Sequence, residues 1–314
     1  RAVRLGQPVK VRENLRLATV DAQMENHPLR RDLTEHLELN DKLARRISGM
    51  KGKEKGLAHR ELNRGWKEVR RIEGQMRDDI LNRAQVLCCT CIGAGHVLLD
   101  GRRFSRVLLD EATQATEPAS LVPLVRGARQ IVLVGDHRQL PPTVISQRAE
   151  KGGLRRSLFE RLAKMGIEPM LLDTQYRMHP AISAFPNEAF YEGRLINGIE
   201  AADRPAPAGL LWNDWEAPIV FLPLKGGEVL SPDGASKENP AEAGWIARLL
   251  EGLLEAGDLA QKDIGIITPY AGQVRAIRDA IPERYDSVEV HTVDGYQGRE
   301  KEVILFSCVR SNDE

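Results

Sequence analysis

Long apolar runs are absent from this sequence, and none approaches the ~18 residues that a membrane-spanning helix needs. The opening residues also lack the charged and apolar pattern of a secretory signal peptide. Cysteine is scarce, with 4 in 314 residues, so a disulfide framework is excluded. We therefore expect no membrane partner and a reducing intracellular compartment, the cytoplasm with the nucleus as an alternative.

An excess of either charge is also missing, because 45 Lys and Arg face 45 Asp and Glu. Any nucleic-acid partner must then be held by a local basic surface and not by overall charge. The hydrophobic share of 42% is enough for real cores, and the length suggests two domains. The chain starts with Arg1 and stops just after an apolar strand, so we expect it to be a piece of a longer protein.

Three of the four cysteines cluster and invite a metal interpretation: Cys88, Cys89 and Cys91. They lie in the strand-like run 85–92, and no second ligand pair follows at zinc-finger spacing. We predict reduced thiols buried in a sheet, and any role beyond packing stays open.

A charged helical segment occupies residues 21–82, where Leu and Ile recur at helical spacing after a short strand signal at 3–11. A turn is expected at 48–56, so the segment is predicted to be a helical hairpin on a sheet domain. Residues 1–82 hold 19 Lys and Arg against 13 Asp and Glu. The hairpin could touch a nucleic-acid backbone or be a solvated amphipathic element.

Strands and helices alternate from residue 84 onward, which is typical of a parallel, doubly wound α/β sheet. In a first domain, 1–169, the expected strands are 85–92, 106–110 and 130–135, and the expected helices are 117–126 and 153–165. In a second domain, 170–314, we expect helices at 240–256 and 271–281 and strands at 170–172, 218–224, 263–268, 287–292 and 301–309.

Two adjacent carboxylates, Asp110 and Glu111, follow the apolar run 107–109, which we predict to be a strand buried on both faces. Ligands of open α/β sheets bind beyond the carboxyl ends of the strands. An aspartate there can hold Mg²⁺ at the β- and γ-phosphates of a nucleotide, and a glutamate beside it can position the attacking water. An exposed acidic turn is the alternative.

A second polar loop, 135–140, follows the next apolar strand. Successive strands usually neighbour each other, so Gln139 is expected close to Glu111, where its amide can donate to a γ-phosphate oxygen. Gly135 permits a close approach of the backbone. His137 is also compatible with a simple turn.

A third segment, 175–180, begins the second domain with Tyr176 and Arg177. The arginine has a rigid fork that suits phosphate oxygens and could act as an arginine finger. The tyrosine offers a ring for a nucleobase. A surface arginine in a turn is the alternative.

A fourth segment, 290–300, carries two glycines, Gln297 and Glu300, which could reach ribose hydroxyls or a phosphate-bound water. Upstream, Thr268 ends another apolar strand. Hydroxyls and amides at strand ends commonly hold a nucleic-acid backbone without reading its sequence.

These segments form an ordered series: Asp-Glu-Ala-Thr at 110–113, Gly-Asp-His-Arg-Gln-Leu at 135–140, Gln-Tyr-Arg-Met-His-Pro at 175–180 and Val-Asp-Gly-Tyr-Gln-Gly-Arg-Glu at 293–300. The series resembles motifs II to V of superfamily 1 helicases, in the branch of up-frameshift, senataxin-like and immunoglobulin-mu-binding helicases. Within that branch it most resembles the up-frameshift (regulator of nonsense transcripts) RNA helicases. The similarity covers almost all of 84–312, and the helical segment more loosely.

The resemblance implies two RecA-like domains, the first incomplete and with residues 21–82 inserted, that close and open with each ATP. It implies movement 5′ to 3′ along single-stranded RNA in nonsense-mediated mRNA decay, as a monomer that meets other surveillance factors through further domains. The implied catalytic residues are Asp110, which holds Mg²⁺, Glu111, which activates water, and Gln139 and Arg177, which contact the γ-phosphate. The implied ATP-binding residues are Tyr176, Gln297, Gly298 and Glu300. The implied nucleic-acid contacts are Thr90, Thr268, Pro269, Thr292 and Val293.

The sequence departs from the family pattern in three respects. It has no Gly-x-x-x-x-Gly-Lys-Ser/Thr, so we expect the phosphate-binding loop upstream of Arg1. The last arginine-bearing motif is expected after the run 309–312. The polypeptide alone is therefore expected to bind ATP weakly and to hydrolyse it barely. The sequences at 140–142 and 293–295 are more similar to the senataxin-like and immunoglobulin-mu-binding branches, which leaves the preference for RNA or DNA open.

Two other functions remain as alternatives. One is a DNA or DNA/RNA helicase of the senataxin or immunoglobulin-mu-binding branch. The other is a non-hydrolysing RNA-binding scaffold, which has no reason to retain the five side chains Asp110, Glu111, Gln139, Arg177 and Glu300.

Overall fold

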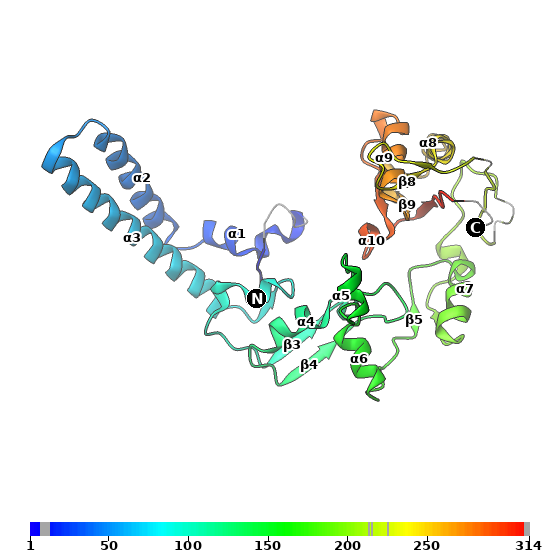
Figure 1. Cartoon of the computed structure of the whole chain (residues 1–314), viewed down its shortest axis with the longest axis horizontal. Coiled ribbons are helices and arrows are strands. Elements are labelled where there is room, and N and C mark those ends of the chain that lie inside the picture. The colour runs from blue at the N-terminus through cyan, green and yellow to red at the C-terminus, as the bar shows by residue number, and fades with distance from the viewer. Residues whose placement is uncertain (7–12, 213, 215, 225, 311–314) are drawn as a thin grey trace. The chain divides into compact units, whose positions relative to one another are not determined.

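The computed structural model describes residues 1–6, 13–212, 214, 216–224 and 226–310 (Figure 1). The chain divides into two compact units, Arg1–Glu168 and Pro169–Glu314. Among the described residues, no helix is both long enough and apolar enough to cross a membrane.

The first unit begins with a two-stranded parallel sheet whose strands are far apart in sequence: β1 (Ala2–Arg4) pairs with β2 (Val86–Cys88). The chain between them forms η2 (Glu13–Ala18), α1 (Val20–Glu25), α2 (Arg30–Ile47) and α3 (Gly52–Asn82). The helices α2 and α3 lie side by side (Figure 1). Both helices of the predicted hairpin are therefore present, with a shorter turn than predicted. Val9 and Val11 of the expected strand lie outside the described residues.

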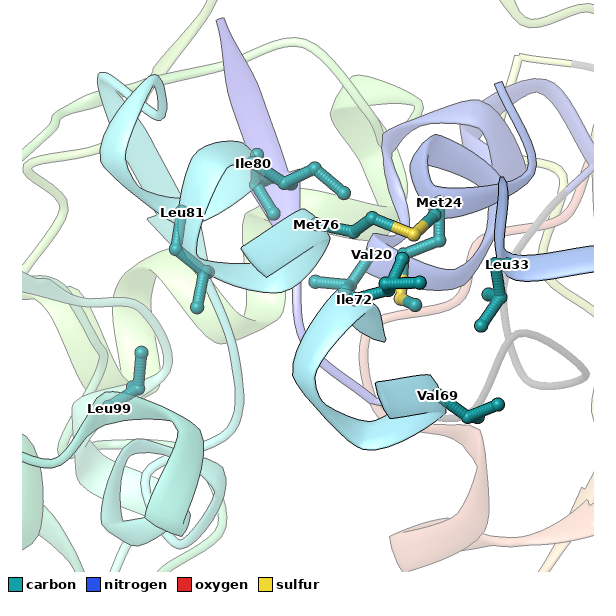
Figure 2. Close-up of a cluster of buried hydrophobic side chains, with 10 residues drawn as sticks. Val20, Met24, Leu33, Val69, Ile72, Met76, Ile80, Leu81 and Leu99 are labelled. Carbon is teal, nitrogen blue, oxygen red and sulfur yellow. The ribbon is translucent and has the colours of Figure 1, made fainter. Parts of the chain in front are cut away.

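One apolar core joins these helices to the strands. Figure 2 shows α3 side chains such as Ile72 and Met76 beside Val20 and Met24 of α1, with Leu33 of α2 near them. The burial explains the helical spacing of apolar residues, since α3 presents one face to this core.

The second part of this unit has the strand–helix–strand order predicted for it. Parallel strands β3 (Arg106–Leu109) and β4 (Gln130–Leu133) flank α4 (Glu117–Leu124). After them come α5 (Gln147–Lys151) and α6 (Leu158–Lys164). The predicted helix 153–165 was too long, because the Ser157 side chain caps a helix that begins only at Leu158.

Two burial predictions for this unit were wrong. Leu108 in β3 is 64% exposed, and β4 is the only strand that pairs with β3 among the described residues. Cys88 and Cys89 are exposed instead of buried. The expected strand 85–92 ends at Cys88, and the chain turns into η3 (Gly93–Gly95).

The second unit is built on a three-stranded parallel sheet. Strand β9 (Ile264–Thr268) lies between β10 (Glu289–Thr292) and β11 (Val303–Phe306). Helices α8 (Pro240–Glu255) and α9 (Ala271–Ala280) share a core with it, in which Leu250, Ile266 and Ile277 are fully buried. These helices and strands match the sequence prediction within a few residues.

The remainder of the second unit differs from the prediction. It contains β5 (Thr174–Gln175), α7 (Pro180–Tyr191), β6 (Ile196–Asn197), η6 (Ala201–Asp203), the antiparallel pair β7 (Val229–Leu230) and β8 (Lys237–Glu238), and α10 (Val293–Tyr296). No strand forms at 170–172 or among the described residues of 218–224, where Pro218 and Pro223 remove backbone donors. The described residues therefore form small parallel sheets with helices, and not one large doubly wound sheet per domain.

Candidate functional site

A tight turn carries the two adjacent carboxylates at the end of β3. Glu111 has φ 51° and ψ 40°, the left-handed region that residues with a side chain seldom adopt. Asp110 Oδ1 accepts a hydrogen bond from the Glu111 amide at 3.1 Å, and Gln114 Nε2 donates to Glu111 Oε2 at 2.8 Å. Both carboxylates are exposed. Backbone strain of this kind concentrates at functional sites, which makes the turn a candidate one.

The loop after β4 meets this turn at the same sheet edge. The Ala112 amide donates to the Val134 carbonyl at 2.7 Å, and a Cβ at Gly135 would lie 3.0 Å from the Thr113 nitrogen. The predicted close approach at Gly135 is therefore confirmed. Gln139 is exposed, and its Nε2 donates to Asp136 Oδ2 at 2.8 Å within its own loop.

In the second unit, an ion pair joins two predicted nucleotide-site residues that are 123 positions apart. Arg177 Nε lies 2.7 Å from Glu300 Oε2, and the side chains are 65% and 66% exposed. An exposed pair of this kind stabilises a protein by roughly 0.2–1 kcal/mol. A phosphate, which accepts two parallel hydrogen bonds from a guanidinium, can therefore compete for Arg177.

The aromatic ring beside this arginine is available for stacking. Tyr176 is 64% exposed, and a Cβ at Gly198 would lie 2.2 Å from its Cε1 atom. The missing side chain at Gly198 thus makes room for the ring. Gln297 is half-buried, and Gly298 has φ 72°, a conformation that favours glycine.

The predicted nucleic-acid contacts differ in accessibility. Thr90 is exposed and its Oγ1 accepts from the Gly93 amide at 3.0 Å. Thr292 caps α10 by accepting from the Gly295 amide at 3.2 Å, directly before Val293, and Pro269 is exposed. Thr268 is 0% exposed, and its hydroxyl has no hydrogen-bond partner among the described residues. The Thr268 side chain is thus inaccessible to a nucleic acid in this structure.

A buried tyrosine that the sequence did not single out anchors the segment 293–300. Tyr296 is 5% exposed, and burial raises the pKa of its phenol to about 12, with Glu289 acting in the same direction. A Cβ at Gly265 would lie within 2 Å of the phenol oxygen, so only a glycine at this position of β9 leaves room for the Tyr296 ring. Burial, aided by Arg299 and Arg278, lowers the pKa of His291, which keeps that ring neutral near pH 7.

The side chains available to a metal ion are few. No group of three or more His, Cys, Asp or Glu is arranged to hold a metal within the described ranges. Partial burial raises the pKa of the Cys91 thiol, which makes it a weak ligand at neutral pH. The exposed Asp110 carboxylate fits Mg²⁺ only if phosphate oxygens or water complete the shell, as is usual for that ion.

Sequence reasoning also missed Gln114, Gln175 and Arg204. Gln114 could have been noticed, because it follows Glu111 by three residues within one turn. The other two hold the loop of Tyr176 and Arg177, and Arg204 lies 27 residues from its partner, beyond any local pattern.

Comparison with known protein families and sequences gives consistent matches. Residues 154–314 and residues 1–147 each match a family described as "AAA domain". The regulator of nonsense transcripts 1 homolog of Neurospora crassa is 44% identical over 255 residues, 79% of this chain and 23% of the relative. Its Drosophila melanogaster counterpart is 43% identical over 254 residues, 79% of this chain and 21% of the relative. The ATP-dependent helicase NAM7 of Saccharomyces cerevisiae is 43% identical over 256 residues, 79% of this chain and 26% of the relative. The chain thus spans about a quarter of the length of these relatives.

Proposed function

The chain belongs to the AAA domain family and is of the superfamily 1 helicase type represented by the regulators of nonsense transcripts; on that premise we propose that it is the motor core of an ATP-dependent RNA helicase. The motor would move 5′ to 3′ along single-stranded RNA and serve nonsense-mediated mRNA decay. The family implies a RecA-like α/β fold. We assign one RecA-like domain to residues 1–169 and a second to 170–314.

The helical segment 21–82 is proposed to be an insertion in the first domain. The parallel pairing of β1 with β2 supports this, because the described part of the chain leaves β1, forms η2 and the helices α1 to α3, and returns to pair with β1.

The ion pair of Arg177 with Glu300 carries the proposal. Two residues expected at one nucleotide, from motifs far apart in sequence, are within hydrogen-bond distance of each other. In the proposed reaction Arg177 contacts the γ-phosphate, while Gln297, Gly298 and Glu300 serve the ribose and phosphates. Tyr176 stacks on the adenine.

The carboxylates after β3 are proposed to supply the chemistry. Asp110 would hold Mg²⁺, which neutralises charge on the β- and γ-phosphates when bound. Glu111 would orient and deprotonate the attacking water, and Gln139 would donate to the γ-phosphate. The left-handed backbone conformation of Glu111 supports this role, because strained conformations of this kind concentrate at functional sites.

The RNA strand is proposed to run along Thr90, Pro269, Thr292, Val293 and the main chain of Thr268. We propose the cytoplasm, and also the nucleus, as the location, and a monomer whose surveillance partners bind outside these residues. Competition between RNA and DNA distinguishes the RNA helicase from the DNA helicase alternative, because the 2′-hydroxyl is what separates the two ligands. The salt concentration must be stated, because phosphate contacts dominate both affinities.

Substitution Glu111→Gln in the full-length protein tests the enzyme assignment. We expect the RNA-stimulated ATPase rate to fall at least about 100-fold, because a general base contributes 10²–10⁴-fold. Affinity for single-stranded RNA is expected to stay within about twofold. Glu168→Gln, at an exposed carboxylate of the same unit, is the matched control. An unchanged ATPase rate in Glu111→Gln would favour the scaffold alternative.

A further inference from the structure

The loop that carries Tyr176 and Arg177 belongs to no helix or strand, so no regular backbone hydrogen bonds hold it. Strand β5 ends at Gln175, and α7 begins only at Pro180. The main-chain groups of residues 176–178 therefore need other partners if the loop is to hold one conformation.

The Gln175 side chain supplies one set of partners from within the loop. Its Oε1 accepts from the amides of Arg177 at 3.0 Å and Met178 at 2.8 Å. Its Nε2 donates to the Met178 carbonyl at 2.8 Å and to Asn197 Oδ1 at 2.7 Å. The second bond ties the loop to β6, which pairs with β5.

The Arg204 side chain supplies the other set from a distant position. Its Nε donates to the Arg177 carbonyl at 3.1 Å, its Nη2 to the Tyr176 carbonyl at 3.5 Å and its Nη1 to the Asp203 carbonyl at 3.2 Å. Within the described ranges, Arg204 pairs with no carboxylate. Its charge is thus directed at main-chain carbonyls alone.

We propose that Gln175 and Arg204 are positioning residues that fix the loop of Tyr176 and Arg177 before a nucleotide binds. Between them they engage the carbonyls of residues 176–178 and the amides of Arg177 and Met178. This inference rests on the proposed function, in which Arg177 contacts the γ-phosphate of ATP. A planar guanidinium with several donors can bridge adjacent carbonyls, which a lysine ammonium cannot do with the same geometry.

Loss of Arg204 should affect the reaction more than the fold. The carbonyls of exposed residues can bond to water instead, so the unit stays folded. The Arg177 side chain, however, would sample more positions, and small misplacements of a catalytic group reduce rates strongly. The effect should therefore pass through Arg177 and vanish when Arg177 is absent.

A double-mutant cycle in the full-length protein tests this. We expect Arg204→Ala to lower kcat for RNA-stimulated ATP hydrolysis about tenfold. Arg177→Ala should lower it about 10³-fold, as for arginine fingers. The double variant should equal Arg177→Ala within about twofold. Arg194→Ala is the matched control and should change nothing, because this exposed arginine makes only a long bond of 3.4 Å to the Tyr191 carbonyl and a 3.8 Å ion pair with the exposed Glu192 among the contacts described for its side chain.

Hydrogen exchange at residues 175–179 supplies a readout that does not need activity. Faster exchange in Arg204→Ala than in Arg194→Ala is expected. An unchanged kcat in Arg204→Ala, or a further tenfold loss in the Arg177→Ala background, would overturn the inference. A wild-type protein without ATPase activity would instead refute the proposed function, and the exchange rates would then decide whether Arg204 fixes the loop.

Discussion

Tyr296 and Arg204 contribute through packing and main-chain contacts, and the sequence predicts a role for neither side chain. The first fits its phenol against Gly265, and the second bonds to main-chain carbonyls of a loop 27 residues away. The sequence predicts roles for Asp110, Glu111 and Arg177 because those roles depend on residue type and motif order. No local sequence pattern shows that Gly265 makes room for the Tyr296 ring. None shows either that Arg204 bonds to the carbonyls of Tyr176 and Arg177.

The buried phenol gives a prediction at this scale. Tyr296 has no hydrogen-bond partner for its hydroxyl among the described residues, and an unsatisfied buried polar group costs about 1–3 kcal/mol. Tyr296→Phe should therefore raise the free energy of unfolding, by about 1 kcal/mol, in urea titrations at pH 7. Tyr285→Phe, which removes a half-buried phenol and keeps the ring under the Arg284 guanidinium, should bring no gain.

The pH dependence follows from the raised pKa of Tyr296. The pKa of Tyr296 is about 12 in the folded chain against about 10 in the unfolded chain, so the folded state favours the protonated phenol. The stability that goes with this protonation is fully present below pH 10 and is lost as pH rises towards 12. Wild-type stability should fall more steeply between pH 10 and 12 than that of Tyr296→Phe. Identical pH profiles, or a destabilised Tyr296→Phe, would contradict the burial of this hydroxyl.

At the scale of elements, local signals predicted helices better than strands. Helix α8 has Asn239 as its cap, with Pro240 in the first position, and each favours a helix start by itself. A strand needs a neighbour that accepts its backbone hydrogen bonds, which an apolar run cannot guarantee. The runs at 170–172 and 218–224 therefore failed as strands, and Leu108 proved exposed although its sequence suggested burial.

Helices α2 and α3 make a close contact at a glycine. Asn40 is 4% exposed, and a Cβ at Gly65 would meet its side-chain oxygen within 2 Å. Gly65→Ala should destabilise the chain by about 1–3 kcal/mol through overpacking. Gly74→Ala, in the same helix with nothing within 4 Å of the added Cβ, should stabilise it by about 0.5–1 kcal/mol. Thermal unfolding of the two variants checks the pair, and equal shifts of one sign would refute the contact.

At the scale of the whole molecule, the order of motifs predicted the family, whereas overall composition could not. A net charge of zero conceals the surplus of Lys and Arg in residues 1–82, which only a position-by-position reading detects. Each unit contains part of the predicted site: the carboxylates and Gln139 in the first, and Tyr176, Arg177 and the 297–300 segment in the second. Both parts come from the ordered motifs, which is why the order of motifs predicted them and composition did not.

Strand separation by the full-length protein tests the motor most directly. The substrate is an RNA duplex with a single-stranded overhang on either its 5′ or its 3′ side, incubated with and without ATP and Mg²⁺. We predict that the duplex with the 5′ overhang is unwound only when ATP is present, and that the duplex with the 3′ overhang stays paired. Unwinding without ATP, unwinding from the 3′ overhang alone, or no unwinding of either duplex would contradict a 5′-to-3′ RNA helicase.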